Sequence, residues 1–242
     1  MLEIACMVDP GKRFPAHDDR AAINSTLVPQ GLYSEIAETS CLVVVCDGVG
    51  GEAFGNEAAE IAAGVFSQLS KLPLTIDIIK EQIAKANEAV IKAQKKDIKH
   101  SKMATTIAGL YINGDDFIAF NAGDSRIYRY RTYLSQISKD HSLWQEQIDL
   151  GFEPMPGQKN VITHYIGGIR AIPEIVDGTG RVFDNDVFIL CTDGVWGVLQ
   201  DNDFENLLSQ GLNVKDSCKA LIDLALQKGS DDNLSAIIIK RI

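Results

Sequence analysis

The sequence is poor in cysteine and has no long apolar run, and each shortage excludes a class of protein. Its five cysteines are odd in number and include no Cys-x-x-Cys pair, which argues against a disulfide framework and against a zinc site. No stretch reaches the roughly 18–20 uninterrupted apolar residues of a membrane-spanning helix. The amino end has no basic segment ahead of an apolar one, so no signal peptide is recognised. We therefore expect a cytoplasmic protein with no membrane partner.

Basic side chains are scarce as well. The chain has 23 Lys and Arg against 33 Asp and Glu, a formal net charge of −10. Binding to nucleic acid depends on clustered Lys and Arg, so nucleic acid is not an expected partner. A substrate that carries phosphate would have to be attracted locally, by bound cations rather than by the overall field. Apolar residues, in contrast, make up 45% of the 242 residues, which is ample for one large domain or two small ones.

Two apolar runs end in the same Asp-Gly dipeptide. Residues 42–46 lead into Asp47 and residues 187–192 lead into Asp193, and a glycine follows each acid. Each run predicts a buried strand, and the glycine permits a sharp exit from it. If the two strand ends lie side by side, the two carboxylates repel, and one must bind a proton unless a cation lies between them. A metal site is therefore the first hypothesis.

The remaining pattern predicts helices grouped outside antiparallel strands. Strands are expected at residues 2–8, 20–24, 41–46, 105–111, 117–121, 126–131, 134–137, 174–182, 186–192 and 234–239. Helices are expected at residues 56–69, at about 76–99, and at 201–209 and 214–227. Because helices and strands do not alternate regularly, a doubly wound parallel sheet is disfavoured. Two stacked sheets, each covered by helices on its outer side, accommodate this order.

Three further segments place acids at turns or next to strands. Asp18 lies in a polar loop near the amino end, Asp124 in a tight turn between two expected strands, and Asp232 directly before the last strand. An acid in such a position commonly hydrogen-bonds its own backbone or is solvated, and this alternative stands for each acid taken singly. Together with Asp47 and Asp193, they are harder to explain as turn residues.

In order along the chain, these segments resemble the motifs of the metal-dependent protein phosphatase family (PPM, the type 2C serine/threonine phosphatases), and those of its bacterial branch in particular. The matching segments are residues 13–18, 47–51, 104–106, 123–126, 139–142, 191–196 and 232–233. The resemblance implies an α+β fold, a four-layer αββα sandwich of two stacked, mainly antiparallel β-sheets flanked by pairs of helices. It also implies a single domain over residues 1–242, with a short flap at about residues 144–168.

The resemblance further implies hydrolysis of phosphoserine and phosphothreonine by a metal-activated water at a binuclear Mn²⁺ or Mg²⁺ centre. Asp47 would bridge the two ions, and the carbonyl of Gly48 would complete the second site. Asp193 and Asp232 would hold the first ion, and Asp124 together with Asp193 would hold a third, weaker ion. The residue types agree with this independently, because ligand sets made only of oxygen suit hard cations such as Mg²⁺ and Mn²⁺.

Two further roles follow from the same resemblance. Asp18 would hold a metal-bound water, and Arg13 would bind the phosphate of the substrate, for which the guanidinium fork is suited. Where the family has Asn-Glu, this chain has Ala16-His17, and His17 could order water at the second metal or point outward. The implied partners are phosphorylated proteins, the substrates of a serine/threonine kinase, and the expected state is a monomer.

Two alternatives to this function stay open. The first, based on the altered Ala16-His17 pair, is a catalytically altered, phosphatase-like module that binds a partner. The acids by themselves also fit a phosphatase that acts on a small phosphate ester such as a nucleotide.

Overall fold

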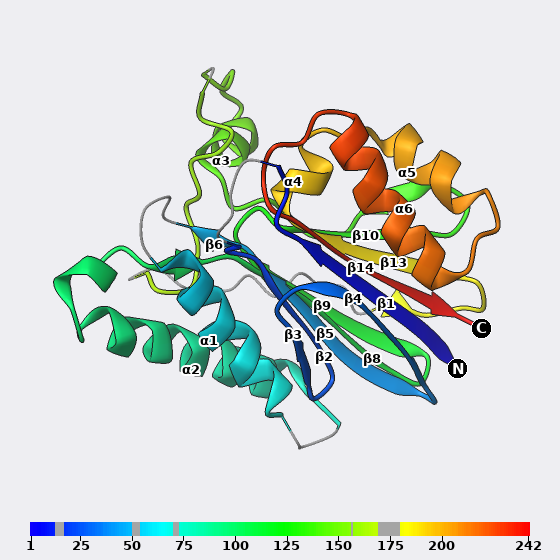
Figure 1. The fold of residues 1–242 in the computed structure, drawn as a ribbon, viewed down its shortest axis with the longest axis horizontal. Coiled ribbons are helices and arrows are strands. Elements are labelled where there is room, and N and C mark those ends of the chain that lie inside the picture. Colours follow the sequence, from blue (N-terminus) through cyan, green and yellow to red (C-terminus); the bar gives the residue numbers. More distant parts are fainter. Residues whose placement is uncertain (13–16, 50–53, 70–72, 156, 169–179) are drawn as a thin grey trace.

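Two six-stranded antiparallel sheets form the centre of the molecule (Figure 1). The computed structural model describes residues 1–12, 17–49, 54–69, 73–155, 157–168 and 180–242. The first sheet has the strand order β11-β10-β13-β14-β1-β4, and the second has the order β12-β9-β8-β5-β2-β3. A short third ladder pairs β6 with β7. Every ladder among the described strands is antiparallel.

The strands of the first sheet come from both ends of the chain. They are β1 (Leu2–Asp9), β4 (Gly31–Ala37), β10 (Arg126–Tyr130), β11 (Leu134–Gln136), β13 (Val187–Cys191) and β14 (Leu234–Arg241). Those of the second sheet are β2 (Arg20–Ile23), β3 (Thr26–Val28), β5 (Ser40–Cys46), β8 (Ile107–Asn113), β9 (Asp116–Ala122) and β12 (Gly180–Arg181). The small ladder consists of β6 (Gly48–Val49) and β7 (Ala104–Thr105).

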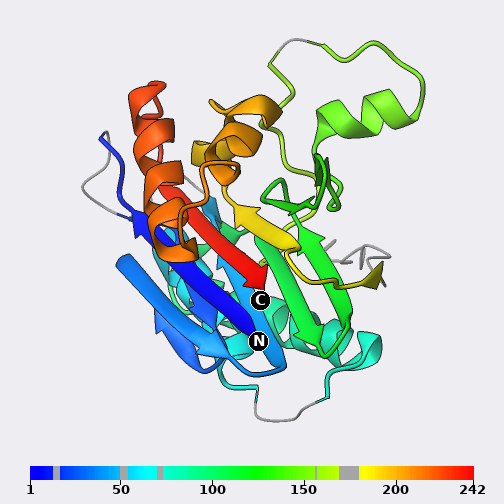
Figure 2. The same ribbon diagram turned by 90° about the vertical axis from the view of Figure 1, so that its right-hand side faces the viewer.

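Helices cover the outer face of each sheet. Figure 1 shows α1 (Gly55–Ser67) and α2 (Ile76–Gln94) on one outer side. It shows α4 (Asp193–Trp196), α5 (Asp201–Leu208) and α6 (Val214–Gln227) on the opposite side. The remaining helices are the short 3-10 turn η1 (Ile98–His100) and α3 (Leu143–Asp149), which extends away from the sheets in Figure 2. The four-layer αββα sandwich expected from the sequence is therefore confirmed.

The apolar run of β5 shows why this order of layers forms. Val43 and Val45 face the core between the two sheets, whereas Leu42 and Val44 face the core under α1 and α2. Successive side chains of a strand point to opposite faces, so a strand covered on both faces needs an uninterrupted apolar run. A third core lies between the first sheet and helices α4, α5 and α6. Among the described residues, no helix is both long and apolar enough to cross a bilayer.

The structure corrects several expected boundaries. The helix expected over residues 76–99 ends at Gln94, because Asp97 caps the separate turn η1 through its carboxylate, which accepts the amide N–H of Lys99 at 3.0 Å. The strand expected over residues 105–111 is divided between β7 and β8 at Thr106, whose amide donates to the carbonyl of Asp47 instead. Of the strand expected at 174–182, only Gly180–Arg181 is a strand within the described part of the chain, and residues 174–179 lie outside it.

Candidate metal centre

Strand register brings the predicted aspartates to one end of the sandwich. In the second sheet Arg20 pairs with Cys46, so the residues before β2 lie beside those after β5. In the first sheet Cys191 pairs with both Arg126 and Ala236, so the end of β13 lies between the turns that precede β10 and β14. The residues at these ends line one cavity of about 270 Å³, the aspartate cavity, formed by Asp18, Asp47, Gly48, Val49, Asp124, Asn160, Ile162, Asp193, Asp232 and Asn233.

The backbone of Asp47 is fixed by two threonines of the β7–β8 segment. Its amide donates to Thr106 Oγ1 at 3.0 Å. Its carbonyl accepts the amide of Thr106 at 2.8 Å and the hydroxyl of Thr105 at 2.9 Å. Thr106 Oγ1 in turn lies 2.7 Å from Ser125 Oγ, next to Asp124. The Thr-Thr pair that the sequence analysis matched to a family motif therefore holds the turn from which Asp47 projects.

Glycine is required at position 48 because the chain comes very close to other backbone there. A Cβ atom at Gly48 would overlap the backbone of Gly55 at the start of α1 and would lie 2.8 Å from the carbonyl oxygen of Asp18. Any side chain would therefore push the Asp47 turn away from α1 and from the Asp18 loop. Gly48 thus allows the strand end and the helix start to meet at the rim of the aspartate cavity.

We expect Gly48→Ala to weaken Mn²⁺ binding about tenfold or more, since displacing the groups that hold and orient metal ligands typically costs that much. Gly64→Ala is the matched control, because Gly64 lies within α1 and a Cβ there would meet no neighbouring described residue within 4 Å. That control should keep its Mn²⁺ affinity and gain up to about 1 kcal/mol of stability from helix propensity. Titration calorimetry with Mn²⁺ and thermal unfolding measure both quantities. Equal Mn²⁺ affinities for the two variants would contradict the role given to Gly48.

The Asp18 loop is tied to the opposite side of the aspartate cavity by Asn233. The amide of Asp18 donates to Asn233 Oδ1 at 2.9 Å, and Asn233 Nδ2 donates to the carbonyl of Pro10 at 2.7 Å. Asp18 Oδ1 accepts the amide of Asn56, in the first turn of α1, at 3.0 Å. The Asp18 carboxylate is therefore held beside the cavity by a helix amino terminus, where negative charge is favoured.

Asp19 is a buried acid to which the sequence analysis gave no role. It is fully buried, and its Oδ2 accepts the hydroxyl of Thr192 at 2.9 Å. Thr192 Oγ1 also accepts the amide of Ser235 at 3.0 Å. These bonds join β2 of the second sheet to β13 and β14 of the first. The sequence shows the acid next to Asp18, but it carries no signal that this side chain points into the core.

Burial and mutual repulsion raise the pKa values of three acids that line the aspartate cavity. Burial raises the pKa of Asp47 well above its ordinary value, and Asp19 and Asp193 raise it further. Burial, followed by the charge of Asp193, raises the pKa of Asp124 to about 7. The pKa of Asp193 is also raised, first by burial and then by Asp232. Without a cation, several of these groups therefore favour the protonated form.

The chemistry of the donor set fits a hard divalent cation. Among the described residues, the functional groups that line the aspartate cavity are mainly carboxylates, with no cysteine or histidine, and oxygen ligands suit Mg²⁺ and Mn²⁺. Within the described residues, however, no three acidic, histidine or cysteine side chains are set at cation-binding separations. Uncompensated carboxylates repel one another, so we expect the charge of a cation to draw them together.

The structure does not test the predicted roles of Arg13 and His17. Arg13 lies outside the described residues, as do Ala16 and the glycines at positions 50 and 51. His17 is half-buried and does not line the aspartate cavity. Burial, followed by the charge of Arg20, lowers the pKa of its imidazole. The roles of Arg13 in phosphate binding and of His17 in ordering water stay predictions.

The segment after α3 supplies two cavity residues that the sequence did not indicate. Asn160 and Ile162 line the aspartate cavity. Ile162 is held by a bridge to Ser142, and Ile166 is held by a bridge to Thr105. Asn160 and Ile162 lie in an irregular stretch without periodicity, so no local pattern could have marked them. They are placed by pairing with distant strands.

Comparison with known proteins gives a consistent result. Residues 31–237 match the protein phosphatase 2C family. The serine/threonine phosphatase stp of Listeria monocytogenes serotype 4b is 24% identical over 236 residues, which cover 92% of this chain and 93% of that protein. Protein phosphatase PhpP of Streptococcus pneumoniae is 29% identical over 217 residues, covering 82% of this chain and 85% of that protein.

Solved structures show the same fold. The S. agalactiae serine/threonine phosphatase has a TM-score of 0.86 and 25% identity, and the match covers 100% of both chains. The catalytic domain of the serine threonine protein phosphatase PstP in complex with two manganese ions has a TM-score of 0.80 and 23% identity, with 99% of each chain covered. The layers described above are therefore those of these phosphatase structures.

Proposed function

Because this chain belongs to the protein phosphatase 2C family and is a protein serine/threonine phosphatase, we propose that it hydrolyses phosphoserine and phosphothreonine in proteins at a binuclear divalent-cation centre. One observation carries the proposal. Five aspartates from five separate segments line one cavity at the end of the sandwich. Burying acids together is unfavourable unless a cation compensates them, so their convergence points to a binding site.

Each acid has a proposed part in holding the cations. Asp47 would bridge two ions, with the carbonyl of Gly48 completing the second site. Asp193 and Asp232 would hold the first ion, and Asp124 with Asp193 would hold a third. All five residues line the aspartate cavity. The PstP structure that shares this fold contains two manganese ions, which supports Mn²⁺ as the first cation to test.

The other residues would bind and orient the reactants. When bound, the cations supply Lewis-acid polarisation of the phosphoryl oxygens and lower the pKa of the attacking water. Asp18 would orient that water, since its carboxylate is fixed beside the cavity by the amide of Asn56. Arg13 would bind the phosphate through two parallel hydrogen bonds. No covalent intermediate on the enzyme is required, which agrees with the burial of all five cysteines.

A cation-dependence assay on a phosphothreonine peptide tests this proposal. We expect turnover with Mn²⁺, weaker or equal turnover with Mg²⁺, and a fall to background when EDTA removes the cation. Undiminished turnover in EDTA would reject a cation-dependent centre. Absence of turnover with every divalent cation would instead favour a phosphatase-like binding module.

Competition between substrates separates the remaining alternative. When a nucleotide and a phosphothreonine peptide are mixed at equal concentrations, the peptide should be hydrolysed faster if proteins are the substrates. Preference for the nucleotide would indicate a phosphatase for small esters. A cytoplasmic location, a monomeric state and opposition to a serine/threonine kinase stay predictions.

A further inference from the structure

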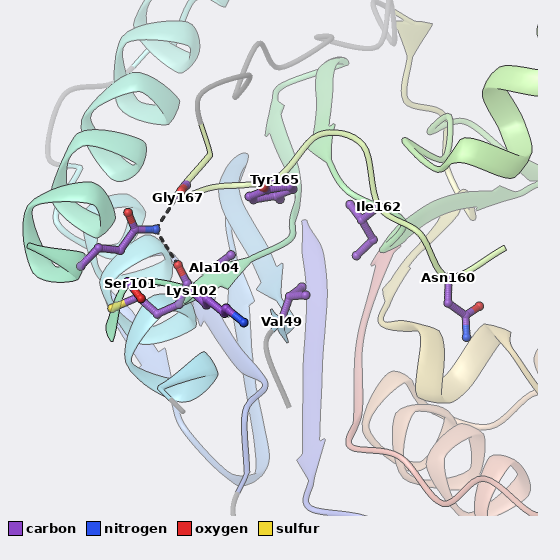
Figure 3. A pocket seen from close by; sticks show the side chains of 10 residues that line it. Val49, Ser101, Lys102, Ala104, Asn160, Ile162, Tyr165 and Gly167 are labelled. Carbon is purple, nitrogen blue, oxygen red and sulfur yellow. Dashed lines mark hydrogen bonds between the residues drawn. The ribbon is translucent and has the colours of Figure 1, made fainter. Parts of the chain in front are cut away.

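A second cavity of about 350 Å³ lies next to the aspartate cavity (Figure 3). We call it the Lys102 pocket and define it by Val49, Lys102, Met103, Ala104, Ile162 and Tyr165. Val49, Asn160 and Ile162 line both cavities, so the two share a wall. A protein substrate whose phosphorylated side chain entered the aspartate cavity would therefore place a neighbouring side chain at the Lys102 pocket.

The walls of the Lys102 pocket are fixed by hydrogen bonds. Gln94 Nε2, at the end of α2, donates to the carbonyl oxygens of Met103 and Gly167, each at 2.8 Å. Thr105 and Ile166 exchange backbone hydrogen bonds of 3.0 and 2.8 Å. Figure 3 draws these two hydrogen bonds as dashed lines, one of which ends at Gly167. A pocket with fixed walls costs little entropy on binding, which favours selective recognition.

The charge of the Lys102 pocket is opposite to that of its neighbour. Lys102 is the one charged residue among the described residues that line it. Its side chain is exposed, extends toward Val49 in Figure 3, and forms no ion pair within the described part of the chain. The aspartate cavity carries five acids, and the whole chain has a net charge of −10. Acidic peptide segments are therefore repelled by this protein in general and attracted at this pocket.

We propose that the Lys102 pocket binds the side chain of an aspartate or glutamate that lies near the phosphorylated residue of the substrate. The ammonium of Lys102 pairs with the carboxylate. The apolar side chains of Val49, Ile162 and Tyr165 pack against the methylene groups that carry it. This inference rests on the proposed function, and it names the class of phosphoprotein segment that the protein prefers, an acidic one.

Peptide kinetics test the proposal. A series of phosphothreonine peptides would carry glutamate, alanine or lysine at each of the three positions on either side of the phosphothreonine. With Mn²⁺ and wild-type protein, we expect at least one position at which kcat/KM falls in the order glutamate, alanine, lysine. Lys102→Ala should lower the glutamate-to-alanine ratio of kcat/KM about fivefold, as expected for a largely exposed ion pair worth up to about 1 kcal/mol. Lys102→Glu should reverse the order, with lysine now preferred.

Lys96→Glu is the matched control, because Lys96 is exposed near the end of α2 and does not line the Lys102 pocket. It makes the same change in net charge and should keep the wild-type order. Turnover of the alanine peptide shows that each variant is folded. If the Lys102 and Lys96 variants change the order equally, or if no position prefers glutamate in a protein that turns over these peptides, the acidic subsite is wrong while the proposed function stands. Absence of turnover of every peptide by wild-type protein with Mn²⁺ would overturn both.

Discussion

Asp47→Asn is expected to lower kcat/KM on a phosphothreonine peptide about 1000-fold in Mn²⁺, while raising the thermal stability of the cation-free protein. Removing the bridging carboxylate would weaken two cation sites at once, and a loss of about 4 kcal/mol of transition-state stabilisation corresponds to that factor. Stability should rise because the pKa of Asp47 is raised by burial and by Asp19 and Asp193. A neutral amide avoids the cost of the buried charge near pH 8.

The opposite signs of these two effects make the Asp47 prediction specific. A substitution that merely damaged the fold would lower activity and stability together. Asp116→Asn provides the control, because Asp116 is an exposed acid at the start of β9 and does not line the aspartate cavity. It should change neither quantity measurably. Activity of Asp47→Asn within tenfold of the wild type would show that Asp47 does not bridge the cations.

In EDTA, the protein is expected to become less stable as the pH rises from 5 to 7, by about 2 kcal/mol for a single fully buried acid. Burial raises the pKa of Asp19 from 3.8 to about 7, although the neighbouring side chains of Ser235 and Thr192 lower it. Burial and Asp193 raise the pKa of Asp124 to about 7. Between pH 4 and 7 the folded protein therefore binds more protons than the unfolded chain. Stability falls across this window and levels off above it.

Binding of Mn²⁺ should restore the folding stability that is lost as the pH rises. Mn²⁺ at 100 times its dissociation constant stabilises a protein that binds it only when folded by about 2.7 kcal/mol. Urea unfolding at pH 5 and pH 8, in EDTA and in Mn²⁺, measures the effect as four free energies of unfolding. We expect the difference between EDTA and Mn²⁺ to be large at pH 8 and small at pH 5, where protons compete with the cation. A cation-free protein that is equally stable at both pH values would show that these acids are not buried together.

Much of the fold could be predicted because strong periodic patterns survive in the structure. The helix expected at residues 214–227 has those bounds, and the run that ends in Asp47 forms β5. The edge strand β4 (Gly31–Ala37) was missed because it pairs only with β1 and has no buried residue. An edge strand needs no apolar run, so its sequence resembles that of a loop. The end of α2 at Gln94 was missed because it depends on contacts far along the chain. The side-chain amide of Gln94 donates to the carbonyl oxygens of Met103 and Gly167.

In the candidate site, too, residues marked by a local sequence pattern could be predicted, whereas residues placed by distant contacts could not. The acids next to strand ends were identified from the sequence because turns and apolar runs mark them locally, and the structure brings Asp47, Asp193 and Asp232 to one cavity. The burial of Asp19 depends on Thr192, far along the chain, and could not be foreseen. No pattern in the sequence marked Lys102 either, and only the fold places it at a pocket beside Val49.

The position of Asp232 has a consequence for protein synthesis. Asp232 comes immediately before β14, which lies between β13 and β1 in the middle of the first sheet. Domains generally fold as units once their strands are available, and here a central strand is synthesised after all its neighbours in the sheet. A nascent chain still lacking β14 can neither close that sheet nor supply its final carboxylate. Phosphatase activity would therefore begin only after β14 has been synthesised and has entered the sheet.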